Sequence, residues 1–281
     1  MVTPLIKRED TVMREAISPA ELLAVTLSYL ATGETFSSLS YSFRISRQAI
    51  SEIVLEVCKA IYTVLKGNFL KIPSTEEEWH TIANRLEDVW QFPKCIGALD
   101  GSYYHNYKGT DSIILMALVD ADLQFIYVDV GTNGRVSDGG VWNKTTLCQA
   151  LMGNKLHIPP SPLPGRIKPV PFCGGRCCIQ PEEPPDEALP GEPAEQLSRA
   201  RRCVENAFGV LANRMRVFRA PIALSPKKVE HIVLASTALH NFLRRQKTGR
   251  TLYTPATLTD REDLGTGDIL PQIWIRLVLA T

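Results

Sequence analysis

The sequence predicts an α/β protein in which an all-helical region precedes a mixed β-sheet flanked by helices. Two observations predict this class. Residues 1–94 place apolar side chains at the three- and four-residue spacing of amphipathic helices. From residue 95 onward, short continuous apolar runs replace that spacing, as in strands buried within a central sheet. With 281 residues, the chain is long enough for one large domain or two ordinary ones.

Four helices are expected in residues 1–94. The first opens at Ser18 and ends before Gly33, since glycine commonly follows a helix. The others cover residues 36–43, residues 47–65 after the N-cap Ser46, and a segment starting at Thr75. Thr75 and Glu78 form the pattern of a capping box. This last helix presents Trp79, Ile82, Leu86 and Trp90 on one side as candidate core residues.

The helices over 36–43 and 47–65, joined by three residues, resemble a helix-turn-helix. In that case Arg47, Gln48 and Ser51 begin the recognition helix and face DNA. The alternative is a plain three-helix support. Residues 1–94 contain ten basic and twelve acidic residues, a balance that argues against strong nonspecific affinity for DNA.

The second region begins with a buried-strand pattern at residues 95–99, which ends on Asp100 and Gly101. The next expected elements are strands at 112–119 and 125–130, a glycine-rich loop at 131–140, and a helix at 141–151. After residue 197 they are helices over 197–215 and 226–246 with an extended piece at 217–219. The apolar side of the last helix contains Val229, Ile232, Val233, Ala235, Leu239, Phe242 and Leu243.

The stretch from residue 159 to residue 193 contains eleven prolines and no helical or strand periodicity. Proline can neither donate to a sheet ladder nor continue a helix, so no fixed structure is expected at residues 172–196. The predicted organisation is a helical domain at 1–94, an α/β domain at 95–250 and an irregular tail at 251–281.

The composition, 44% hydrophobic and 22% charged, is typical of a globular protein, and no apolar run reaches the length of a membrane span. Seven cysteines at irregular positions favour reduced thiols and an intracellular protein. Cys173, Cys177 and Cys178 lack the fourth ligand of a zinc site. Residues 197–250 contain twelve Lys or Arg and two Glu, which indicates either a polyanion-binding face or a solvated helix surface.

Asp100 is a candidate metal ligand because reacting groups gather at strand ends in α/β folds. Hydrolysis of a phosphodiester with two Mg²⁺ or Mn²⁺ ions requires carboxylates from separate elements, and Glu205 on a later helix is a candidate partner. Taken singly, each residue also has an ordinary interpretation. A strand-end Asp is commonly a turn or cap residue, and a helical Glu is commonly solvated.

Six sequence motifs carry a family resemblance: Cys-Ile-Gly-Ala-Leu-Asp-Gly (95–101), Tyr-Lys-Gly (107–109), Leu-Met-Ala-Leu-Val-Asp-Ala (115–121), Gly-Arg-Val-Ser-Asp-Gly-Gly-Val-Trp (134–142), Arg-Ala-Arg-Arg-Cys-Val-Glu-Asn-Ala-Phe-Gly-Val-Leu (199–211) and Leu-His-Asn-Phe-Leu (239–243). Together they resemble the DDE endonuclease domain of Harbinger transposase-derived nucleases. The resemblance implies an RNase H-like nuclease core with a divalent metal. It implies Asp100 as the first catalytic carboxylate, Glu205 as the third, and Asp138 as an acidic loop position near the metal.

Two departures separate the chain from that family. The segment between Gly101 and Tyr107 is about a dozen residues shorter than in family members. In addition, the strand ending Val-Gly-Asp-x-Ala-Phe, which supplies the second catalytic Asp, is missing, and residues 173–196 take its place. The expected nuclease core is therefore incomplete. Asp138 and Asp186 are the candidate substitutes for the missing carboxylate.

A reading-frame error is our hypothesis for the second departure. Residues 172–180 can be encoded as TTT TGT GGT GGG AGA TGC TGC ATT CAG, and the same string read one base on gives Phe-Val-Val-Gly-Asp-Ala-Ala-Phe. Our hypothesis is that residues 172–196 are an out-of-frame translation, in which the codon of the missing Asp straddles Arg176 and Cys177. The transcript sequence tests this hypothesis directly.

Three functional interpretations remain open. The first is a metal-dependent DNA endonuclease that is damaged by loss of the second Asp. In this interpretation Arg201 and Arg202 share the helical face of Glu205, where they either hold a phosphate or form ion pairs with Glu205. The second is an inactive DNA- or protein-binding relative, and the third is a frame-shifted product without a stable fold. The expected partners are DNA and a separate DNA-binding protein. The expected location is the nucleus, with the cytoplasm as an alternative.

Overall fold

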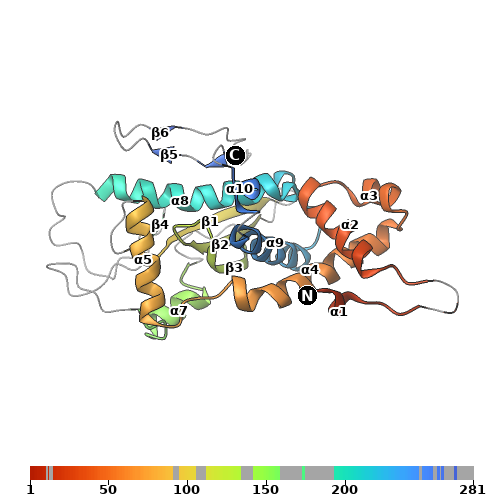
Figure 1. Cartoon of the computed structure of the whole chain (residues 1–281), viewed down its shortest axis with the longest axis horizontal. Helices are drawn as coiled ribbons and strands as arrows, with labels where there is room; N and C mark the ends of the chain where they lie inside the picture. The colour runs from red at the N-terminus through yellow and green to blue at the C-terminus, as the bar shows by residue number, and fades with distance from the viewer. Residues whose placement is uncertain are drawn as a thin grey trace.

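The computed structural model describes residues 1–10, 12, 15–90, 95–105, 112–133, 142–158, 173–174, 193–246, 249–255, 258–259, 261–262 and 269–270. Within them the chain is a mixed α/β protein, in which an N-terminal helical region is followed by a small sheet packed between helices (Figure 1). The predicted order of a helical region before an α/β region is therefore confirmed.

The N-terminal helices are α1 (Thr3–Ile6), α2 (Pro19–Thr32), α3 (Phe36–Phe43) and α4 (Arg47–Phe69). α2 starts in a full capping box between Ser18 and Glu21. It ends at Gly33, which has a φ of 71°. A Cβ atom at Gly33 would lie 2.8 Å from the carbonyl oxygen of Arg216. Glycine is thus required there both by the left-handed backbone and by the close approach of a distant segment.

α3 and the start of α4 match their predicted positions, and Ser46 caps α4 by accepting a hydrogen bond from the backbone N–H of Ala49. α4 continues past its predicted end at Leu65 as far as Phe69. The ring of Phe69 packs edge-on against Phe242, with centroids 5.4 Å apart. This tertiary contact extends the helix beyond what local periodicity indicates.

α5 (Glu76–Trp90) begins close to its predicted start. The hydroxyl of Thr75 accepts from the backbone N–H of Glu78, as the capping box predicts, while the Glu78 carboxylate reaches back to the backbone N–H of Ser74. That bond, followed by the bond from Lys71, lowers the pKa of Glu78 to about 2. The indole of Trp79 is buried and donates to the carbonyl oxygen of Leu156.

The sheet contains β1 (Ala98–His105), β2 (Ser112–Val119), β3 (Phe125–Asn133) and β4 (Cys173–Gly174), in the order β3-β2-β1-β4. β1 to β3 are antiparallel, and β4 is parallel to β1. The prediction that the first strand ends on Asp100 and Gly101 is wrong, because β1 pairs with the whole length of β2 and continues to His105. β3 extends likewise through Gly131 into the predicted loop.

The region predicted to lack a strand provides a short one. Cys173 and Gly174 pair with Ala98 and Leu99 of β1, and α8 (Pro193–Arg214) begins before its predicted start at Leu197. Backbone pairing requires only N–H and C=O groups, which cysteine and glycine supply, and proline is tolerated in the first turn of a helix. Residues 175–192 lie outside the described part.

Two apolar clusters lie on opposite faces of the sheet, because side chains alternate along each strand. One face packs against α8, α9 (Pro226–Arg245) and the N-terminal helices through Ala98, Leu115, Ala117, Val119 and Phe125. The other face, through Leu99, Ile114, Met116 and Leu118, packs against α5 and α7 (Thr146–Met152). In Figure 1, α5 and α7 lie at the end of the molecule away from α2 and α3.

Two smaller elements differ from expectation. α7 starts at Thr146 because the hydroxyl of Thr145 caps it by accepting from the backbone N–H of Cys148. The predicted extended piece is the 3₁₀ helix η1 (Arg216–Arg219), in which the adjacent residues Val217 and Phe218 are both buried. A strand could not bury two adjacent side chains on one face.

The tail, predicted to be irregular, contains α10 (Arg250–Tyr253) and the antiparallel pair of β5 (Arg261–Glu262) with β6 (Ile269–Leu270). Cys58, Cys95, Cys148 and Cys203 are buried free thiols. No helix among the described residues is both long and apolar enough to cross a membrane.

Candidate active site

Asp100 lies in β1 on the face of the sheet that α8 covers. Two neighbours of Asp100 are fully buried in the cluster that includes Cys203 and Val204 of α8. They are Ala98, two residues earlier on β1, and Ala117, the residue of β2 that pairs with Asp100. Asp100 itself is only partly buried. Its carboxylate is therefore held by a rigid strand beside α8 while it keeps access to solvent.

Glu205 lies on α8, and α8 packs against β1. Its neighbours Cys203, Val204 and Ala207 are buried, whereas Glu205 is exposed. Arg202, one turn earlier, is partly exposed on the same side of the helix. Arg201 belongs to α8, but its side chain is outside the described part. The fold thus brings the helix of Glu205 onto the strand of Asp100 from 105 residues away in sequence.

The thiol of Cys203 fixes α8 against the sheet. Its Sγ donates a hydrogen bond to the carbonyl oxygen of Asp120, at 3.3 Å. Burial raises the pKa of this thiol well above its ordinary value, so the group stays neutral and is a donor. This contact links the helix of Glu205 to the turn that connects β2 and β3.

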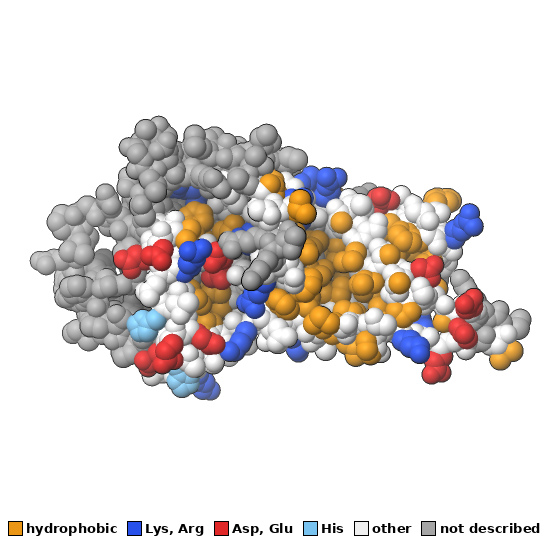
Figure 2. All heavy atoms as spheres, in the orientation of Figure 1, with side chains coloured by type: hydrophobic (Ala, Val, Ile, Leu, Met, Phe, Trp, Pro, Cys, Tyr) orange, Lys and Arg blue, Asp and Glu red, His pale blue; other side chains and the backbone are white. Residues whose placement is uncertain are grey.

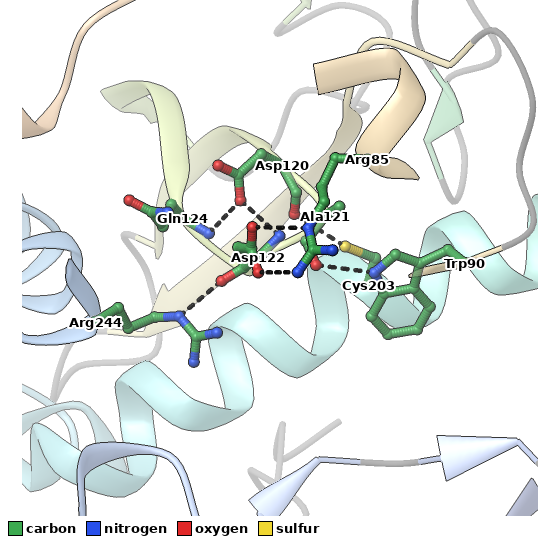
Figure 3. Close-up of polar contacts among 8 residues, drawn as sticks. All are labelled: Arg85, Trp90, Asp120, Ala121, Asp122, Gln124, Cys203 and Arg244. Carbon is green, nitrogen blue, oxygen red and sulfur yellow. Dashed lines mark hydrogen bonds and ion pairs between the residues drawn. The ribbon is translucent and has the colours of Figure 1, made fainter. Parts of the chain in front are cut away.

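That turn, residues 120–124, is held by side chains from α5, α8 and α9 (Figure 3). Asp120 Oδ1 accepts from the backbone N–H groups of Asp122 and Gln124, at 2.9 and 2.8 Å. The outside contacts are Arg85 to the carboxylate of Asp122 (3.3 Å), Trp90 Nε1 to the carbonyl oxygen of Ala121 (3.0 Å), and Arg244 Nε to the carbonyl oxygen of Asp122 (2.7 Å). Burial raises the pKa of Asp120 to about 6. Side chains from three helices therefore hold the turn between β2 and β3 in place.

The candidate ligands are of the type that a divalent cation prefers, but there are too few of them. Asp100 and Glu205 carry carboxylate oxygens, the ligand type that Mg²⁺ and Mn²⁺ prefer. Among the residues that the structure describes, no cluster of three or more His, Cys, Asp or Glu side chains could hold a metal. Cys173 and Gly174, the β4 residues beside β1, have no carboxylate, and Asp138 and Asp186 lie outside the described residues.

The start of the predicted recognition helix is partly exposed. Arg47 and Gln48 are exposed, and Ser51 is partly buried. The exposed side of α4 continues, however, into Glu52 and Glu56. The Glu56 carboxylate pairs with Arg8, and further along α4 packs against α9. Carboxylates beside Gln48 oppose the approach of phosphate groups.

The basic block at residues 197–250 is partly structural. Four of its arginines donate hydrogen bonds within the fold: Arg214 to the carbonyl oxygens of Leu252 and Tyr253, Arg219 to those of Ala212 and Asn213, Arg244 to that of Asp122, and Arg245 to that of Asn68. These side chains tie helix ends and loops together. The net charge of the block therefore overstates the surface available to a polyanion.

Sequence reasoning missed the polar face of α9. The predicted apolar residues Leu239, Phe242 and Leu243 are only partly buried, whereas His240 and Asn241 are completely buried. Asn241 accepts from the backbone N–H of Phe125 (2.9 Å) and donates to the carbonyl oxygens of Phe125 (2.7 Å) and Phe69 (2.5 Å). The signal was present, since His240 lies seven residues after the core residue Val233.

His240 is a neutral core histidine. Its Nε2 donates to the carbonyl oxygen of Leu123 (2.8 Å), and its Nδ1 accepts from the hydroxyl of Tyr253 (3.0 Å). Burial lowers the pKa of His240 to about 3. The hydrogen bonds and the lowered pKa assign His240 to the structure of the β2–β3 turn.

The contribution of His240 to folding stability should fall as the pH drops below 6.5. Between pH 6.5 and about 3, His240 binds a proton in the unfolded chain but not in the folded chain, so acid favours unfolding. Lowering the pH from 6.5 to 5 should cost about 2 kcal/mol through this residue. Asp120, with a raised pKa of about 6, opposes the effect because it favours the folded chain at lower pH.

Urea denaturation of the wild type and of His240→Gln at both pH values measures this dependence. Glutamine retains a donor and an acceptor but does not titrate. The variant should lack the loss due to His240 and retain the opposing effect of Asp120. Equal pH dependence in the two proteins would show that His240 does not cause the loss.

Comparison with known proteins bears on this arrangement. A family model described as DDE superfamily endonuclease matches residues 91–241, slightly more than half of the chain. A curated relative, Protein ALP1-like from Arabidopsis thaliana, is 22% identical over 251 residues, which cover 81% of this chain and 61% of the relative. The chain thus spans less than two thirds of that relative. No solved structure matches the chain significantly.

Proposed function

Since the chain belongs to the DDE superfamily endonucleases, as the sequence motifs indicated, we propose that it binds DNA and hydrolyses its phosphodiester bonds with divalent metal, at a reduced rate. The observation that carries the proposal is the packing of α8 on β1, which places Glu205 on an element adjacent to Asp100. The mixed sheet, with β4 parallel to β1, supports an RNase H-like core.

Asp100 and Glu205 would hold the metal, with Asp138 as a third candidate ligand. When bound, the cation supplies Lewis-acid chemistry, which activates water and stabilises the leaving oxygen. The chain itself contributes positioning. β1 fixes Asp100, Cys203 fixes α8 through the carbonyl oxygen of Asp120, and Arg202 supplies positive charge on the side of Glu205 for a phosphate. Arg201 is a second candidate phosphate contact.

The rate is expected to be reduced because the second carboxylate is missing. Loss of a partner that only orients a metal ligand typically costs about 10–100-fold in activity or metal affinity, and loss of a direct ligand should cost more. Cys173 and Gly174, which lie beside β1 where the second carboxylate strand belongs, supply no oxygen side chain. Nicking by the wild-type chain should therefore be slow.

Asp100→Asn should abolish the nicking of supercoiled plasmid in Mg²⁺ or Mn²⁺, because asparagine retains the shape of aspartate without its charge. The matched control is Asp129→Asn, a partly buried carboxylate in β3 on the opposite face of the sheet. It should nick like the wild type. Nicking that survives Asp100→Asn, or that Asp129→Asn removes equally, would contradict the proposed site.

A DNA-binding protein without catalysis is the second candidate, favoured by the lack of a carboxylate in β4. It would bind DNA in EDTA in a salt-sensitive manner and would not nick in metal. A separate DNA-binding protein remains a proposed partner, and the nucleus remains the proposed location, as the substrate requires. A chain with no cooperative thermal transition would instead support a frame-shifted product without a stable fold.

A further inference from the structure

A second set of basic residues lies outside α4. Arg216 and Arg219 belong to η1, and Lys227 and Lys228 belong to the first turn of α9; we call these four residues the η1–α9 surface. No Asp or Glu occurs between residues 206 and 229, so this stretch is uniformly positive. Arg216 and Lys227 are exposed, Lys228 is partly exposed, and none of the three makes an ion pair or side-chain hydrogen bond within the described residues.

The geometry of η1 brings two arginines to one side. In a 3₁₀ helix, residues three apart are eclipsed, so Arg216 and Arg219 point to the same side while Val217 and Phe218 are buried. Arg219 is held by the carbonyl oxygens of Ala212 and Asn213. Its pKa is lowered by burial and then by the charge of Arg216. A bound anion would relieve this repulsion.

The start of α9 adds further positive charge. Its first turn contains Lys227 and Lys228 and no acidic residue, and the side chain of Ser225 does not cap the helix. The N-terminus of a helix carries partial positive charge, so lysines there add to the dipole instead of offsetting it. The two halves of the surface thus attract the same kind of ligand.

The surface lies where the helical region meets the α/β region. η1 packs against α2, and Gly33 allows the close approach to Arg216. Figure 2 shows Lys and Arg side chains at the upper edge of the molecule, where α8 ends beside α2. From Glu205 to the end of α8 at Arg214 is nine residues, or about 14 Å of helix, which corresponds to roughly four base pairs. One duplex could reach both Glu205 and this surface.

We propose that the η1–α9 surface, and not the start of α4, provides the main contacts with the phosphate backbone of duplex DNA. The inference rests on the proposed function, because it takes DNA as the substrate. The exposed side of α4 presents Glu52 and Glu56 after Gln48, whereas the η1–α9 surface is followed by one carboxylate, the partly exposed Glu230. Phosphate binding by lysine and arginine predicts affinity that is sequence-independent and strongly salt-dependent.

The test measures binding of the full chain to a labelled 30-base-pair duplex in EDTA, across a range of salt concentrations. The variant is Arg216→Gln, Lys227→Gln, Lys228→Gln, which spares the structural Arg219. Each lost phosphate contact lowers the salt slope by about 0.9, so the slope should fall by roughly three and the affinity by roughly 100-fold at 0.1 M salt. A second variant, Arg47→Gln, Gln48→Ala, should lose much less affinity.

The matched control, Lys59→Gln, Lys144→Gln, Lys155→Gln, removes the same charge from exposed lysines elsewhere. It should bind nearly like the wild type. The proposal is overturned if the wild type does not bind, if the surface variant keeps the wild-type slope, or if the control loses as much. Nicking that survives Asp100→Asn would contradict the proposed catalysis. It would not contradict DNA binding by the η1–α9 surface, because binding is measured in EDTA, where no cleavage occurs.

Discussion

Replacing residues 172–179 by Phe-Val-Val-Gly-Asp-Ala-Ala-Phe is expected to raise metal-dependent nicking by more than about 100-fold, the upper end of what loss of an orienting partner costs. The replacement puts two valines at Cys173 and Gly174, which already pair with β1. β-Branched residues suit a strand better than cysteine and glycine do. The new carboxylate would then follow β4 by two residues, beside the strand of Asp100.

A matched replacement with Asn in place of the new Asp separates the carboxylate from the strand. It restores the same apolar residues but supplies no charged ligand, so it should stabilise the fold without raising the nicking rate. Initial rates on supercoiled plasmid, in Mg²⁺ and in Mn²⁺, give the comparison. If the Asp and Asn replacements nick equally, the missing carboxylate does not limit the reaction, and the assignment of the second carboxylate to this place is wrong.

The helix ends could be predicted from sequence because their signals are local. Ser18, Ser46 and Thr75 each cap the helix that follows, and Gly33 ends α2, as the sequence indicated. The ends of β1 and β4 could not be predicted in this way. Their lengths depend on pairing with β2 and with each other, and a strand's partner is not visible in its own residues.

The candidate site was only partly accessible to sequence reasoning. Asp100 and Glu205 were identified by their motifs, and the structure places them on elements that pack together. The charge count of the basic block left open whether it forms a polyanion-binding face or a solvated helix surface. It did not reveal that Arg214 and Arg244 donate to carbonyl oxygens distant in sequence. A charge count cannot reveal a tertiary hydrogen bond. The polar face of α9 was also missed, although the position of His240 seven residues after Val233 indicated it.

Asn241→Ala is expected to destabilise the fold by about 3–4 kcal/mol, since buried polar groups left unpaired cost about 1–3 kcal/mol each. Asn241 is fully buried and makes both of its bonds to Phe125 through the backbone N–H and C=O groups at the start of β3. Alanine leaves both groups unpaired in the core, together with the carbonyl oxygen of Phe69. No other described side chain donates to or accepts from the backbone of Phe125.

Urea denaturation should show a lower midpoint for Asn241→Ala with an unchanged slope, because the surface exposed on unfolding stays the same. Asn213→Ala is the matched control. Asn213 is partly exposed at the end of α8, its side chain makes no hydrogen bond within the described residues, and its replacement should change stability by less than about 0.5 kcal/mol. Equal stability of the two variants would mean that Leu-His-Asn-Phe-Leu at residues 239–243 does not hold the β2–β3 turn. The motif would then need a different explanation from the one that its buried hydrogen bonds give.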